Sequence, residues 1–81
     1  MLRYYFNLKD GRVFLDDEGT ELADIHDARK EAIRYGGDVL RDCAGASLWA
    51  GEPWRLWVTD QPNGQGKTLF TLNFWAVEGE P

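Results

Sequence analysis

The first eleven residues constrain the fold of this chain more than any other segment. Large residues alternate from Arg3 to Lys9, and the pair Asp10-Gly11 ends the run. Alternation followed by Asp-Gly is the strongest short-range sequence signal for a strand that enters a tight hairpin turn. Strand parity predicts one inward set, made of Leu2, Tyr4, Phe6 and Leu8. The segment therefore predicts a first strand at 2–9, and it names no chemistry.

Size and charge exclude several classes of protein. The chain has 81 residues, which is the size of one domain, so we expect a single domain over 1–81. The formal net charge of −5 disfavours nucleic acid as a partner, because an acidic surface repels phosphates. One cysteine forms no disulfide framework or multi-cysteine zinc site, and it fits a reducing cytoplasm. No apolar run approaches the ~20 residues that span a bilayer, so we expect no membrane association.

The remaining elements follow from periodicity and turn residues. They are a second strand at 12–16, a polar turn at 17–20, a helix from the N-cap Asp24 to about Cys43, a connector at 44–53, a third strand at 54–60 and a fourth at 67–77. The order ββαββ predicts an α+β fold in which a four-stranded antiparallel sheet has one helix packed on one face.

The predicted helix has one apolar stripe. Its members are Ile25, Ala28, Ala32, Gly36, Val39, Leu40 and Cys43. Gly36 lies at the centre of the stripe, which predicts that the helix approaches the sheet closely there, over a bulky inward aromatic residue. The alternative is a frayed or kinked helix at Gly36-Gly37, since each glycine costs about 1 kcal/mol against alanine. We expect Cys43, on the stripe, to be a buried structural thiol.

Two stretches carry a resemblance to a known family. They are Arg3-Tyr4-Tyr5-Phe6-Asn7-Leu8-Lys9-Asp10-Gly11 and Asp16-Asp17-Glu18-Gly19-Thr20-Glu21-Leu22, the second followed by Asp24, Ala28 and Glu31-Ala32. Together with a closing strand at Thr71-Leu72-Asn73-Phe74, they make the chain similar to a family of small bacterial proteins known as a domain of unknown function. The resemblance implies the ββαββ order and lends no activity. The chain departs from the family at Leu15 and Ala23, where proline is common, and at the double glycine of the helix.

Two sequence patterns imitate known binding sites. Gly64-Gln65-Gly66-Lys67-Thr68 resembles the end of a phosphate-binding loop, but Gln61 stands where that motif needs glycine, and a strand follows instead of a helix. The segment is therefore interpreted as a hairpin turn. An acidic run at the strand-to-helix turn comprises Asp16, Asp17, Glu18, Glu21, Asp24 and Asp27. A divalent metal or small ligand there stays an alternative, although the EF-hand spacing fails and carboxylates are expected at any helix N-terminus.

No catalytic constellation is visible. His26 and Cys43 are the only histidine and cysteine, and both fall on the predicted helix, too far apart for a nucleophile–base pair. We therefore expect no enzyme activity, no catalytic residues, no metal ligands and no cofactor.

The helix-free face of the sheet is the most unusual predicted feature. Strand parity places an interaction face there, made of Arg3, Tyr5, Arg55, Trp57, Leu69 and Trp75. Soluble monomers rarely expose large aromatic patches, and Tyr, Trp and Arg are enriched at binding hot spots. We therefore expect a non-enzymatic module that forms a homo-oligomer, such as a homodimer, or binds a protein partner. Two alternatives remain for this face: a solvated surface with cationic stems over the rings, and single-stranded nucleic-acid binding.

Overall fold

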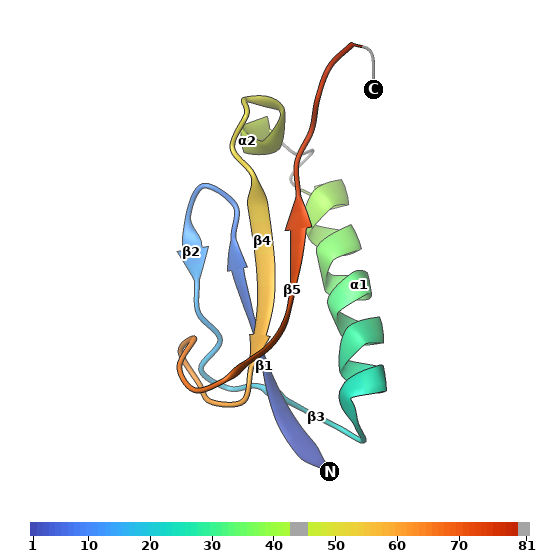
Figure 1. Cartoon of the computed structure of the whole chain (residues 1–81), viewed down its shortest axis with the longest axis vertical. Coiled ribbons are helices and arrows are strands. Elements are labelled where there is room, and N and C mark those ends of the chain that lie inside the picture. The colour runs from blue at the N-terminus through green and yellow to red at the C-terminus, as the bar shows by residue number, and fades with distance from the viewer. Residues whose placement is uncertain (43–45, 80–81) are drawn as a thin grey trace.

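A computed structural model describes residues 1–42 and 46–79 of the chain (Figure 1). The elements are β1 (Leu2–Lys9), β2 (Val13–Phe14), β3 (Thr20–Leu22), α1 (Ile25–Asp42), α2 (Ala46–Trp49), β4 (Trp54–Thr59) and β5 (Thr68–Phe74). The antiparallel sheet has the order β2-β1-β4-β5, with β3 paired to β1 off this path. The α+β class and the single main helix are confirmed, and the sheet has five strands where the sequence predicted four.

The additional strand arises because β2 and β3 pair with different parts of β1. Leu8 and Lys9 pair with β2, and residues 2–4 pair with β3. Between them the chain leaves β1, so the predicted second strand at 12–16 shortens to two residues. The Asp16 carboxylate replaces the missing backbone partner there, because its Oδ2 accepts the Phe6 N–H at 2.9 Å.

The helix α1 begins where the sequence predicted. Oδ1 of Asp24 accepts the Asp27 N–H at 3.0 Å, which is the expected capping bond at a free helix N-terminus. The described helix runs without a break through Gly36 and Gly37 and ends at Asp42. Cys43, which the sequence predicted to be a buried thiol, lies outside the described residues.

The core lies between α1 and the inner face of the sheet, which is the face that α1 covers (Figure 1). Its fully or nearly buried members are Tyr4, Phe6, Leu8, Ala28, Ala32, Leu56 and Val58. Gly36 is buried above it, and a Cβ added there would lie 3.0 Å from Cζ of Phe74. The predicted close approach of the helix over an inward aromatic residue is therefore confirmed.

A short helix, α2, interrupts the predicted connector and closes one end of the sheet. The Ser47 hydroxyl donates to the carbonyl oxygen of Asp10 at 2.9 Å and accepts the Trp54 indole N–H at 2.7 Å. These bonds tie α2 to the β1–β2 turn and to the start of β4. Within residues 1–42 and 46–79, no helix has the length and apolar character needed to cross a membrane.

Candidate functional site

The outer face of the sheet, opposite α1, carries three of the predicted interaction residues. Tyr5 lies on β1, and Arg55 and Trp57 lie on β4, each alternating with buried inward residues. Neighbouring strands place Asn7 beside Trp57 and Lys9 beside Arg55.

One end of the outer face is covered by the protein's own loops. The Asn7 side chain, 0% exposed, donates to Thr59 Oγ1 and to the Trp57 carbonyl, both at 3.2 Å. Its Oδ1 accepts the Asp16 N–H at 3.0 Å, so the segment at 15–19 is held against this face. A buried amide with these partners is a structural element of the fold, because such groups must be satisfied.

The two loops that cover this end also reach the predicted aromatic residues. The Asn63 N–H donates to the carbonyl of Asp16 at 2.8 Å, which joins the β4–β5 loop to the 15–19 segment. A Cβ added at Gly64 would lie 3.8 Å from the Trp57 ring, and one added at Gly19 would lie 2.8 Å from Tyr5. Both aromatic side chains are therefore half-buried, and the expected open aromatic patch does not form.

The other predicted face residues lie elsewhere. Leu69 packs against the core, because a β-bulge opposite Val58 and Thr59 shifts it out of the strand alternation. Arg3 is tied to the β3 side, where its guanidinium donates to the Glu21 carboxylate at 2.7 Å and to the Glu18 carbonyl at 2.8 Å. Trp75 is exposed beyond the end of β5.

A polar and cationic strip remains open at the other end of the outer face. Lys9, Arg55 and Asn73 form one cross-strand row, and Trp57 pairs with Thr71 in the next. The ion pairs of the described residues include neither Lys9 nor Arg55. A shallow hollow of about 500 Å³ lies over this strip.

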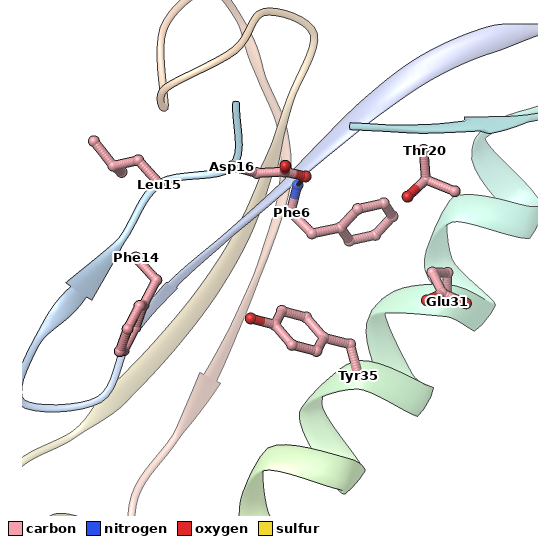
Figure 2. A pocket seen from close by; sticks show the side chains of 7 residues that line it. All are labelled: Phe6, Phe14, Leu15, Asp16, Thr20, Glu31 and Tyr35. Atoms are coloured by element: carbon pink, nitrogen blue, oxygen red, sulfur yellow. Dashed lines mark hydrogen bonds between the residues drawn. The ribbon is translucent and has the colours of Figure 1, made fainter. Parts of the chain in front are cut away.

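A single helix on a sheet of this width leaves grooves beside it, and two of them flank α1 on the β5 side and on the β2 side. The β5-side groove is lined by Arg29, Ile33, Phe70, Thr71 and Leu72. The β2-side cleft is lined by Phe6, Phe14, Leu15, Asp16, Thr20, Glu31 and Tyr35, with a volume of about 310 Å³ (Figure 2). Neither of these grooves is predicted by the sequence, since each depends on strand order and on the position of α1.

The β5-side groove borders a free strand edge. Among the described strands, in the order β2-β1-β4-β5, β5 has a neighbour on one side only. From Thr68 to Val77 the chain has no charged residue and no proline. Ile33, on the helix flank above this edge, is 63% exposed. Long uncharged edges of this kind attract further strands, and natural proteins usually protect them with charges or proline.

The β2-side cleft combines aromatic rings with carboxylates. Tyr35 extends from α1 towards β2, and Phe14 extends from β2 on the opposite side of the cleft (Figure 2). Burial first, and then the negative charges of Asp16 and Asp10, raise the pKa of the Tyr35 hydroxyl above its ordinary value. Glu31 forms an ion pair with Arg34 at the rim of the cleft.

Two carboxylates of the acidic turn, Asp16 and Asp24, accept hydrogen bonds from backbone N–H groups. Oδ1 of Asp16 accepts the N–H groups of Glu18 and Gly19 at 3.1 and 3.0 Å, in addition to the Phe6 bond. Asp24 caps α1. In the part of the chain that the structure describes, no three His, Cys, Asp or Glu side chains gather closely enough to hold a metal ion.

The segment that imitates a phosphate-binding loop is a hairpin connection, as expected. Gly64 and Gly66 have positive φ angles of 70° and 74°, and the Lys67 N–H donates to the Asp60 carboxylate at 2.8 Å. β5 follows the segment where the motif requires a helix.

Comparison with known proteins gives a family and no activity. A family model described as a domain of unknown function, DUF6894, matches residues 3–75. No curated protein and no solved structure matches the chain. The match confirms the resemblance drawn from the first strand, the acidic turn and the helix.

Proposed function

We propose that this chain, which belongs to the DUF6894 family of unknown function, is an interaction module. In this proposal the module has no enzymatic activity and self-associates. The proposal rests on the free edge of β5 with the apolar β5-side groove beside it. The proposed surface differs from the centre of the outer face, where loops leave Tyr5 and Trp57 half-buried. The single cysteine supports a reducing cytoplasm as the compartment.

A second copy of the chain fits this edge better than an arbitrary strand. When an antiparallel strand pairs with its own copy about a two-fold axis, inward residues meet inward residues and outward ones meet outward ones. Phe70 and Leu72 would then join their counterparts into one apolar surface beneath the two Ile33 side chains. Lys67 precedes the uncharged run and Glu78 follows it, so an antiparallel copy has its Glu78 end on the side of the first chain's Lys67 end.

Sedimentation equilibrium of the purified protein tests this proposal. We expect wild type to populate a dimer at about 100 µM, a concentration that reveals an interface with a Kd in the micromolar range. Ile33→Asp places a charge in the interface and should give a folded monomer. The matched control is Val13→Asp, because Val13 is a similarly exposed aliphatic residue, at 56%, on the opposite edge of the sheet.

The sedimentation results for the two variants distinguish pairing at β5 from the alternatives. A dimer that survives Val13→Asp and is lost in Ile33→Asp supports pairing at β5. A strict monomer at every concentration contradicts self-association, and equal loss in both variants contradicts the assignment to this edge.

A second candidate function has one specific observation in its favour. On the open strip of the outer face, Lys9 and Arg55 lie side by side next to Trp57. Single-stranded nucleic acids bind to surfaces that combine stacking aromatic residues with cations. The net charge of −5 opposes such binding.

Fluorescence anisotropy with a short labelled single-stranded oligonucleotide at low and high salt tests this second function. We expect salt-sensitive binding that Arg55→Gln and Trp57→Leu weaken and that Trp49→Leu, an exposed tryptophan on α2, leaves unchanged. No binding at low salt, or equal effects of the two tryptophan variants, would contradict it.

A further inference from the structure

We propose that the β2-side cleft binds an alkylated ammonium ion, a cation whose charge is spread over small apolar groups. This site is separate from the free edge of β5, since the two lie on opposite flanks of α1. The proposal rests on the combination of side chains that the cleft brings together and on the sign of its electrostatic potential.

Three aromatic side chains from three elements line the cleft. Phe6 comes from β1, Phe14 from β2 and Tyr35 from α1, and Figure 2 shows Phe14 and Tyr35 approaching from opposite walls. Aromatic faces attract cations through the ring quadrupole, and sets of such rings are the usual recognition device for alkylated ammonium groups. Phe14 already shows this attraction, because the Arg12 guanidinium lies 5.1 Å from the centre of its ring.

The charges around the cleft favour a cation. Asp16 lies at one end, and Glu31 lies on the α1 wall, where its ion pair with Arg34 offsets part of its charge. Burial is the first cause of the raised pKa of the Tyr35 hydroxyl, and the negative charges of Asp16 and Asp10 add to it. The same negative charges would repel an anionic ligand.

The lining also distinguishes between kinds of cation. The Asp16 carboxylate already accepts three backbone N–H groups, and Glu31 is paired with Arg34. A small metal ion needs several oxygen ligands that it contacts directly, whereas an alkylated ammonium needs apolar contact and a negative field. The exposed apolar surface of Phe14 and Leu15 at the mouth fits the second kind of ligand.

The test is a titration followed by the NMR signals of the Tyr35 ring, assigned by their loss in Tyr35→Phe. The probe is choline at constant ionic strength, and the reference is 3,3-dimethyl-1-butanol, its neutral isostere. We expect saturable chemical-shift changes of the Tyr35 ring with choline, and about tenfold weaker binding of the isostere. A tenfold difference corresponds to ~1.4 kcal/mol of binding free energy, which lies within the range of cation–aromatic attraction.

Two matched variants locate the site. Phe14→Leu keeps an apolar side chain but removes the aromatic face, and it should weaken choline binding about fivefold. Phe70→Leu makes the same change in the β5-side groove and should leave binding unchanged. A peptide with one trimethyllysine distinguishes the source of the cation: tighter binding than choline indicates a protein ligand, and equal binding indicates a free small molecule.

Three results would overturn the proposal. They are unsaturable shifts with choline, equal binding of choline and its neutral isostere, and wild-type affinity in Phe14→Leu. Because a monomer retains the complete cleft, these results are independent of whether the protein self-associates through β5.

Discussion

Gly36 is a position at which α1 lies close to the sheet. A Cβ there would lie 3.0 Å from Cζ of Phe74 and 3.8 Å from Cδ1 of Leu56. Overpacking costs typically about 1–3 kcal/mol, and helix propensity returns up to about 1 kcal/mol. We therefore expect Gly36→Ala to lower the free energy of unfolding, measured by urea denaturation.

The neighbouring glycine provides the control for this prediction. A Cβ at Gly37 meets nothing within 4 Å, so Gly37→Ala should be neutral or stabilising by up to about 1 kcal/mol. Removing the obstacle by Phe74→Leu should reduce the penalty of Gly36→Ala in a double-mutant cycle. If both alanine variants stabilise the protein, the Phe74 ring moves aside at little cost and the close approach is not a constraint.

Asn7 is the second residue with a large expected effect. Asn7→Ala leaves the Asp16 N–H and the Trp57 carbonyl without their partner under the covering loops. We expect a loss of about 2–4 kcal/mol in the free energy of unfolding, because unsatisfied buried groups carry their full desolvation penalty. Asn73→Ala, on the exposed strip of the same face, should stay within about 0.5 kcal/mol of wild type.

Tyr35 predicts a dependence of stability on alkaline pH. Its pKa is raised in the folded state, mainly by burial and then by Asp16 and Asp10, from the ordinary value of 10.0. The unfolded chain therefore loses this proton first as pH rises, so the stability contribution is complete below about pH 10 and is lost above it. The free energy of unfolding should fall more steeply above pH 10 in wild type than in Tyr35→Phe. Equal slopes would contradict the assignment.

At the scale of elements, Asp16 fixes the segment between β2 and β3 against β1. Asp16→Ala removes the acceptor of three backbone N–H groups, those of Phe6, Glu18 and Gly19. We expect a loss of about 2–4 kcal/mol, since bonds to a charged acceptor are worth more than neutral ones. The exposed neighbour gives the control: Asp17→Ala should change stability by less than about 0.5 kcal/mol, and a similar loss in both variants would indicate a general charge effect.

The elements that sequence reasoning found are those whose signal is local. β1 follows from its own alternation and the Asp10-Gly11 turn, and α1 follows from the Asp24 cap and its apolar stripe. β3 was missed because Thr20 to Leu22 is short and becomes a strand only by pairing with the start of β1. The bulge that turns Leu69 towards the core likewise depends on the partner strand.

The candidate sites depend on long-range arrangement, which strand parity alone does not contain. Parity put Tyr5 and Trp57 on the outer face correctly, but it does not show that two distant loops fold over them. The free edge of β5 requires the strand order, although its uncharged run was visible in the sequence. The β2-side cleft requires the position of Tyr35 opposite Phe14, which neither local pattern contains.

At the scale of the whole molecule, self-association predicts that thermal stability depends on protein concentration. Pairing at β5 favours the folded state by mass action, so a hundredfold rise in concentration should add up to about 2.7 kcal/mol per dimer. The midpoint of thermal unfolding should rise by several degrees for wild type and stay constant for Ile33→Asp. A constant midpoint in wild type, over a range in which sedimentation shows dimer, would mean that pairing is too weak to matter for folding.

The free edge of β5 has a geometric consequence for any ligand of the clefts. Two copies joined at β5 would form one continuous sheet in which the β2-β1-β4-β5 paths give a row of eight strands, with β2 at both outer ends and β3 off the row in each copy. A two-fold axis normal to the sheet puts both helices on the same side, so both clefts open on that side. Seven strand spacings of ~4.8 Å separate the ends by about 34 Å. The assembly would present two clefts on one side and would favour ligands with two cationic groups over ligands with one.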